Sequence, residues 1–178
     1  VRSRRQRQMC IRDRPISGAT TKDYTLAQED VGSTITITAS WNDNHGTAES
    51  VTSAPTALVT NVNDSPTGNV TISGTAQQEQ TLTASNTLAD PDGISGAITY
   101  QWNRVNNSNN SNISATISGA TSSTYTLTQS DVGSTITVTA SYTDNQGTAE
   151  SVTSAATSTI ANVNDLPTGN ITISGTVE

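Results

Sequence analysis

The sequence contains no phenylalanine, one histidine, one cysteine and one lysine. A single cysteine excludes a disulfide within the chain. No run of eighteen apolar residues is present, which excludes a membrane-spanning helix from this sequence. No segment shows the apolar period of an amphipathic helix either, so we expect no helical domain.

The basic residues are unevenly distributed. Residues 1–14, VRSRRQRQMCIRDR, contain six of the eight Lys and Arg, and the rest of the chain carries two basic against fourteen acidic side chains. A basic arm ordinarily indicates a nucleic acid or an anionic surface as partner. Here the stretch from Met9 to Asp13 resembles the translation of a sequencing-library adapter, so we predict that residues 1–14 are a disordered remnant with no nucleic-acid partner. The thiol-free, acidic remainder agrees with an extracellular protein.

One long segment occurs twice, 101 residues apart: DVGSTITITASWNDNHGTAESVTSA at 30–54 and DVGSTITVTASYTDNQGTAESVTSA at 131–155. The same offset relates VNDSPTGNVTISGT at 62–75 to VNDLPTGNITISGT at 163–176. A copied segment at domain-sized spacing is typical of a tandem array. The sequence therefore predicts the C-terminal half of a truncated repeat at 15–65, a complete repeat at 66–166 and the first strand of a further truncated repeat at 167–178.

Within the complete repeat, apolar residues alternate with Thr and Ser, which favours strands. We expect strands at 69–73, 80–86, 97–103, 123–128, 134–142 and 148–160. We expect turns at 90–93 (DPDG) and 144–147 (DNQG), and a mobile polar loop at 105–112. The strand at 97–103 places Ile98, Tyr100 and Trp102 on one face, which indicates a core tryptophan and not a sugar platform. Short strands separated by turns predict an all-β fold, an antiparallel sandwich.

The repeat resembles the immunoglobulin-like domains found in tandem in large bacterial surface adhesins. The resemblance covers residues 66–166 and depends on Trp102 in YQWNR and on the run SSTYTLTQSDVGSTITVTASYTDNQG at 122–147. The inter-sheet cysteine pair of antibody-type domains is replaced by the small or aliphatic residues Leu82, Ala84, Val138 and Ala140. The resemblance thus implies an Ig-like β-sandwich whose core is held by packing alone.

The residues give little support for an enzyme. His45 is the only histidine, and the copied position holds Gln146. No Ser/His/Asp or Cys/His set can be assembled within the repeat, and no glycine-rich phosphate loop or cluster of His and Cys is present. We therefore expect no catalytic activity.

Calcium is the more specific hypothesis, because hard divalent cations prefer carboxylate, amide and backbone oxygens. The candidate ligands lie in turns and linkers: Asp90, Asp92, Asp144, Glu150, Asn162, Asn164 and Asp165, with Asp43, Glu49, Asn61, Asn63 and Asp64 as earlier copies. The linker NVNDLP is also similar to the D-x-N-D-N-x-P connection of cadherins, whose oxygens hold calcium between successive domains. The alternative is that Asp and Asn serve only as turn formers, because their side chains bond the local backbone.

The resemblance implies a non-catalytic extracellular repeat segment of a bacterial surface adhesin, a stalk or adhesion array, with calcium as a stiffening cofactor. Its expected partners are neighbouring repeats of the same chain and a cell-surface or matrix ligand bound by other domains, with no membrane insertion. The alternative is a carbohydrate- or ligand-binding accessory module of a secreted hydrolase. Many near-identical repeats would favour the first, and one or two beside a catalytic domain the second.

Overall fold

The computed structural model describes residues 14–106 and 113–176. The predictions for residues 1–14 and for the loop at 105–112 fall mostly outside these ranges. The described residues belong to two compact units, one ending at Thr60 and the other beginning at Asn61. Their only helical elements are the three-residue 3₁₀ turns η1 (Gln28–Asp30) and η3 (Gln129–Asp131). Neither turn is long or apolar enough to cross a membrane.

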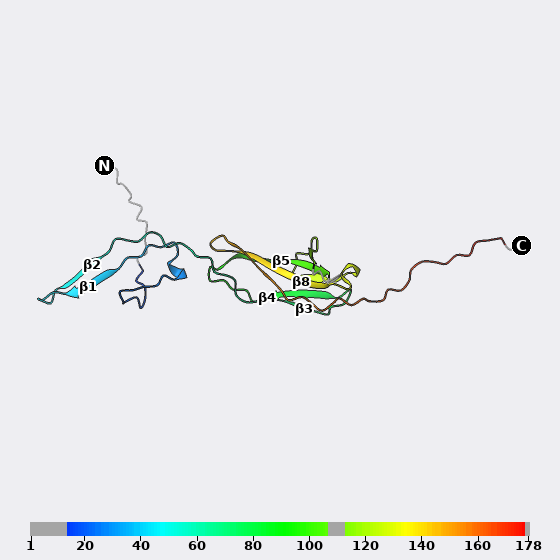
Figure 1. Ribbon diagram of the computed structural model, residues 1–178, viewed down its shortest axis with the longest axis horizontal. Coiled ribbons are helices and arrows are strands. Elements are labelled where there is room, and N and C mark those ends of the chain that lie inside the picture. Colours follow the sequence, from blue (N-terminus) through cyan, green and yellow to red (C-terminus); the bar gives the residue numbers. More distant parts are fainter. Residues whose placement is uncertain (1–13, 107–112, 177–178) are drawn as a thin grey trace, which may run out of the picture. The chain divides into compact units, whose positions relative to one another are not determined.

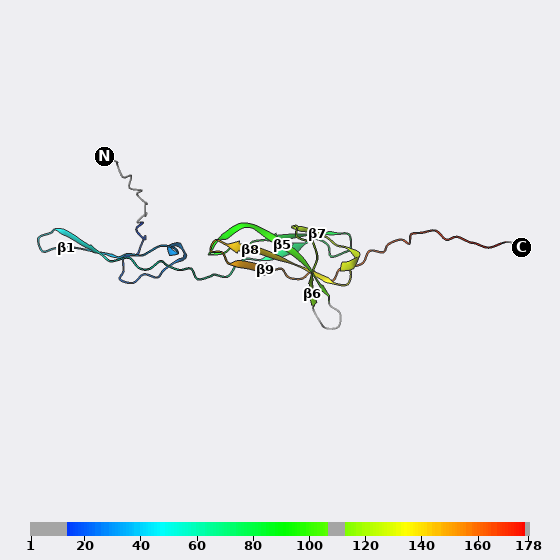
Figure 2. The ribbon, with the colours of Figure 1, turned by 90° about the horizontal axis from the view of Figure 1, so that it is seen from above.

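Two antiparallel sheets form the second unit (Figures 1 and 2). The first sheet has the order β3 (Val70–Ser73), β4 (Thr81–Asn86) and β7 (Thr124–Thr126). The second has the order β6 (Ile113–Thr116), β5 (Ile94–Asn106), β8 (Thr135–Asp144) and β9 (Ala149–Thr153). Every neighbouring pair is antiparallel, and the predicted all-β antiparallel sandwich is confirmed.

The core lies between these two sheets. Strand β8 alternates perfectly, burying every second residue from Ile136 to Asp144, because successive side chains of a strand point to opposite faces. Trp102 of β5 is fully buried, as predicted, and its ring centroid lies 5.8 Å from that of Tyr125. Its indole N–H donates to the carbonyl of Ser122 at 2.8 Å. Leu82, Ala84, Val138 and Ala140 are buried in the same cluster. Packing alone therefore fills the position that a disulfide would occupy in an antibody-type domain.

The predicted last strand, 148–160, is wrong in its second half, because β9 ends at Thr153. Beyond it, the hydroxyls of Ser154 and Thr157 accept hydrogen bonds from the backbone of Val138 and Ile136. Side-chain bonds of this kind replace ladder bonds and interrupt regular pairing. Strand β6 was not expected, because all four of its residues are exposed and its sequence therefore need not alternate between apolar and polar positions.

Two backbone bridges connect the beginning of the second unit to distant segments. Thr67 pairs antiparallel with Ala89, and Gln77 pairs in parallel with Ala161. The parallel bridge is short, but it fastens the segment after β3 to the segment that leaves the unit. The first and last parts of this unit are thus held together directly.

The first unit contains η1 and a hairpin of β1 (Thr38–Asn42) and β2 (Ala48–Thr52), paired antiparallel. Every residue of both strands is exposed. Ile37 and Trp41 are 58% and 50% exposed, whereas their copies Val138 and Tyr142 are 0% and 5% exposed. The copied sequence therefore forms the same hairpin in both places, but it is covered by a second sheet only in the second unit.

Candidate functional site

The predicted acidic turns meet at one end of the second unit. The turn at 90–93 lies between β4 and β5, and its backbone closes with a bond from Gly93 N to Asp90 O of 2.9 Å. Ile94 at the start of β5 pairs with Asp144 at the end of β8, which brings this turn beside the β8–β9 hairpin. A side chain at position 93 would overlap the amide of Asn145, so glycine permits this approach.

Asp144 is the most buried carboxylate at this end. It is 1% exposed, and its Oδ1 accepts hydrogen bonds from the backbone N–H of Gln146 and Thr148 at 2.8 and 2.7 Å. Its Oδ2 is buried without a hydrogen-bond partner. Burial alone would raise the pKa of Asp144, but the bonds from Thr148, Gln146 and Gly147 hold it below its ordinary value. The side chain is therefore an ionised carboxylate with one unused oxygen.

Tyr142 joins the same group of side chains. Its hydroxyl donates to Asp90 Oδ2 at 2.6 Å, and Asp90 Oδ1 accepts from the backbone of Asp92 at 2.8 Å. Burial raises the pKa of Tyr142 most, followed by the hydrogen bond to Asp90 and the negative charges of Asp90, Glu150 and Asp144. Carboxylates from three segments thus act on one buried hydroxyl.

The segment that leads into the second unit is bound at this end as well. The backbone N–H of Asp64 donates to Asp92 Oδ2 at 2.8 Å, and the side-chain amide of Asn63 donates to Glu150 Oε1 at 2.8 Å. Asp92 is 3% exposed. The structure therefore brings together six predicted residues: Asp90, Asp92, Asp144, Glu150, Asn63 and Asp64. We call this group the acidic end.

The other predicted residues lie elsewhere. Asn162, Asn164 and Asp165 belong to the segment that leaves the second unit, beside the bond from Val163 N to Gln78. In the first unit, Asp43 accepts from the backbone of His45 and Thr47 in the same way as its copy Asp144, and Glu49 pairs across the hairpin with Trp41. Over residues 14–106 and 113–176, no group of three or more Asp, Glu, His or Cys has an arrangement that could hold a metal ion.

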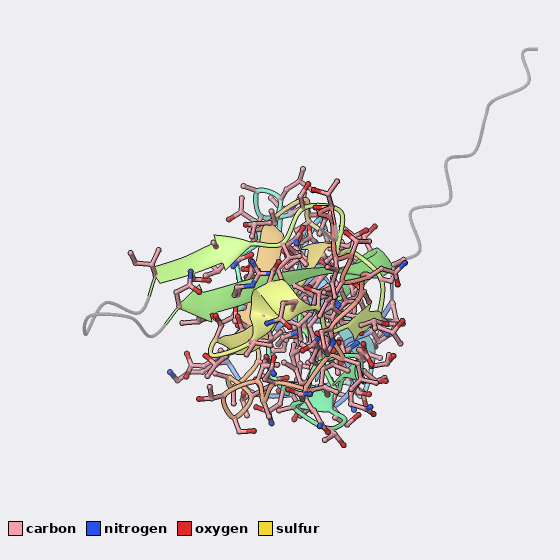
Figure 3. The ribbon with its side chains drawn as sticks, turned by 90° about the vertical axis from the view of Figure 1, so that its right-hand side faces the viewer. Atoms are coloured by element: carbon pink, nitrogen blue, oxygen red, sulfur yellow. The ribbon has the colours of Figure 1, made fainter. Side chains whose placement is uncertain are left out.

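Two residues at the acidic end, Tyr142 and Asn145, were not expected there from the sequence. Tyr142 was not named as a candidate, yet its hydroxyl donates to Asp90. Asn145 was treated only as a turn residue, yet it lies against Gly93. The alternation of 134–142 correctly places Tyr142 inside but carries no information on which polar group its hydroxyl meets. Many of the side chains at the surface end in oxygen (red in Figure 3), so acidic and hydroxyl groups alone do not single out a site.

Residues 66–154 match the family model described as the AIR9 A9 domain, an immunoglobulin-like family. No curated protein and no solved structure matches the chain significantly.

Proposed function

The chain belongs to the AIR9 A9 domain family of immunoglobulin-like domains, and on this premise we propose that it is a non-catalytic extracellular repeat module of a bacterial surface adhesin. Its role there is to extend an array of similar units that holds a binding end away from the cell.

The observation that carries this proposal is the position of the two connections of the second unit. The incoming segment is bound near the end of β8, where Asp92 holds Asp64. The outgoing segment leaves near the start of β8, where Ile160 N donates to Ser134 O at 2.8 Å. Ten residues separate these ends along the strand, which is roughly 30 Å at about 3.3 Å per residue. A unit with connections at opposite ends lengthens an array each time it is repeated.

Spin labels at two equivalent positions test whether the chain enters and leaves the second unit at opposite ends. Ser65 and Leu166 are both exposed, and each is replaced by labelled cysteine in a chain whose Cys10 is serine. We expect a separation of about 30 Å or more by pulsed electron resonance. A separation below about 15 Å would place both connections at the same end and would contradict an extending role.

The acidic end supports a further part of the proposal, that calcium stiffens the module. The unused Oδ2 of Asp144 supplies one oxygen, and Asp90, Asp92 and the linker amide of Asn63 supply the hard oxygens that calcium prefers. Because no three carboxylates in the described part of the chain are arranged as a metal site, the ion would depend on amide, backbone and water oxygens as well. Extracellular calcium modules bind in the range of roughly 10⁻⁴ to 10⁻³ M.

Calcium bound only to the folded unit should raise its melting temperature. The expected stabilisation is about 2.7 kcal/mol at a hundredfold excess over Kd, which is a shift of several degrees in a calorimetric scan. Chelator should reverse the shift, and magnesium should produce less of it, because magnesium demands a tighter octahedral shell.

A matched pair of variants identifies the ligand. Asp144→Asn should abolish the calcium response, whereas Asp43→Asn, the same change in the copied hairpin of the first unit, should leave it intact. Identical melting curves of the unsubstituted chain in calcium and in chelator would refute the calcium proposal, and the acidic end would then consist of turn formers.

A further inference from the structure

The second unit holds its outgoing chain with a buried glutamine. Gln78 is 5% exposed, and its backbone N–H donates to Ala161 O at 2.9 Å. Ala161 N donates in turn to Ala76 O at 3.0 Å, and Val163 N donates to the side-chain oxygen of Gln78 at 3.3 Å. The unit therefore fixes the outgoing backbone as far as Val163.

The same unit holds its incoming chain with two carboxylates. Glu150 accepts the side-chain amide of Asn63, and Asp92 accepts the backbone N–H of Asp64, both at 2.8 Å. A little further on, Thr67 N donates to Ala89 O at 2.7 Å. The incoming backbone is therefore fixed from Asn63 onward.

These two segments are copies of one another. Residues 61–64 and 162–165 both read NVND, so Val62 corresponds to Val163 and Asn63 corresponds to Asn164. Val62 is 79% exposed, whereas Val163 is partly buried beside the unit that it leaves. The second unit therefore holds Val163 of its outgoing segment, and it holds Asn63 and Asp64 of its incoming segment.

We propose that consecutive units of this sequence are joined by a linker without a free residue, since the preceding unit holds its valine and the following unit holds the next two residues. The partner of Asn164 and Asp165 is then the Asp92–Glu150 pair of another copy of the second unit. This inference rests on the proposed array of units, but it requires no cation.

Backbone ¹⁵N relaxation of the full chain in chelator tests whether the second unit holds both its incoming and its outgoing segment. The amides of Asn63, Asp64 and Val163 should have order parameters near those of β8, about 0.85, as in rigid backbone. Values below about 0.6 at these positions would overturn the proposal, because they mark flexible backbone.

Two variants serve as controls for each other. Asp92→Ala should lower the order parameter of Asp64 and leave that of Val163 unchanged, whereas Gln78→Ala should do the reverse. If Asp92→Ala does not fold, Glu150→Ala on partly exposed β9 removes the acceptor of Asn63 and should release its side-chain amide. Linker amides that stay equally ordered in all folded variants would contradict these contacts.

The proposed contact of Asn164 and Asp165 with a following unit is tested in a chain lengthened beyond residue 166 by a second copy of residues 66–166. Asp165 should become as ordered as Asp64, and Asp92→Ala in the added copy alone should reverse this. Disorder of Asp165 in the lengthened chain would overturn the proposed contact between consecutive units. The label distance between residues 65 and 166 tests the array, so the two proposals fail separately.

Discussion

At the scale of residues, Asp131 shows how a buried carboxylate fixes the corner before β8. Its Oδ1 binds Arg104 Nε at 2.7 Å and a second guanidinium nitrogen at 2.6 Å. Its Oδ2 accepts from the hydroxyl of Tyr125 and from the backbone and hydroxyl of Thr128, at 2.8 to 2.9 Å. The carboxylate is fully buried, so each of these donors replaces water.

This network predicts acid sensitivity. Burial alone would raise the pKa of Asp131, but the bonds from Thr128, Arg104 and Tyr125 hold it below its ordinary value. The stabilisation is therefore complete above the unfolded pKa of about 3.9 and is lost as the pH falls through the folded pKa. Denaturant unfolding at a series of pH values should show a steep loss of stability below about pH 4.

The variant Asp131→Asn is the check on that assignment. It should reduce the unfolding free energy at neutral pH by about 3 kcal/mol, because Arg104 loses its buried partner. Its acid dependence should be shallower than that of the unsubstituted chain, with a residual slope from Asp144. An unchanged slope would exclude Asp131 as a source of the acid sensitivity.

Glu79 is the one residue other than glycine with a positive φ, 68°, among the described residues. It is exposed, and its N–H donates to Leu127 O at 3.0 Å, which fixes the left-handed turn. A left-handed conformation costs an L-residue roughly 1–2 kcal/mol, and glycine avoids most of this. Glu79→Gly should therefore stabilise the unit by about 1 kcal/mol in denaturant unfolding.

The neighbouring substitution Gln80→Gly is the control for that variant. Gln80 is exposed as well but does not have a positive φ, so glycine there adds only unfolded-state entropy and should destabilise by about 0.5–1 kcal/mol. If both variants lowered stability equally, the turn would not carry backbone strain.

At the scale of elements, the two copied hairpins separate local from tertiary effects. Both fold with the same register, since Trp41 pairs with Glu49 as Tyr142 pairs with Glu150. Leu127, just after β7, is 1% exposed, whereas its copy Leu26 is 54% exposed. Strand formation thus follows from the local alternation of residues, and burial follows from the presence of a facing sheet.

Substitution of Leu127 and of its copy Leu26 measures this difference in burial. Leu127→Ala should lower the unfolding free energy of the second unit by about 3 kcal/mol through lost burial and a cavity, whereas Leu26→Ala should change it by less than about 0.5 kcal/mol. Chemical denaturation followed by tryptophan fluorescence gives both values. Equal losses for the two variants would mean that the first unit contributes to the same core.

Much of the sandwich could be predicted from residue patterns. Period-two alternation located β8 and its buried face, and Gly147 marked the hairpin turn, where its φ is 94°. The end of β9 could not be predicted, because Ser154 and Thr157 read as ordinary strand residues until their hydroxyls meet the backbone of β8. The carboxylates of the acidic end were named from the sequence, and their role as calcium ligands stays a prediction. The contact of Tyr142 with Asp90 could not be predicted, since tertiary structure determines which group its hydroxyl meets.

At the scale of the whole molecule, the repeated sequence is strongly acidic. Apart from residues 1–14, only Lys22 and Arg104 are basic, and Arg104 is used by Asp131. Outside residues 1–14, both units therefore carry a net negative charge, and like charges repel one another. The carboxylates of the acidic end bind the backbone of Asp64 and the amide of Asn63, so the second unit holds its own incoming segment without basic side chains.

Gln77 and Ala161 form a parallel bridge, and we expect this bridge to determine how the second unit responds to a pull on the chain. Tension enters near Asp64 and leaves near Val163. It therefore pulls the two bridged segments, those at Gln77 and Ala161, in opposite directions along their length. Their bonds, Gln78 N to Ala161 O and Ala161 N to Ala76 O, are then loaded in shear and must break together, not one after another. In single-molecule pulling, Ala161→Pro, which removes one of these donors, should lower the rupture force far more than it lowers the melting temperature. An unchanged rupture force would place the mechanical resistance elsewhere in the sandwich.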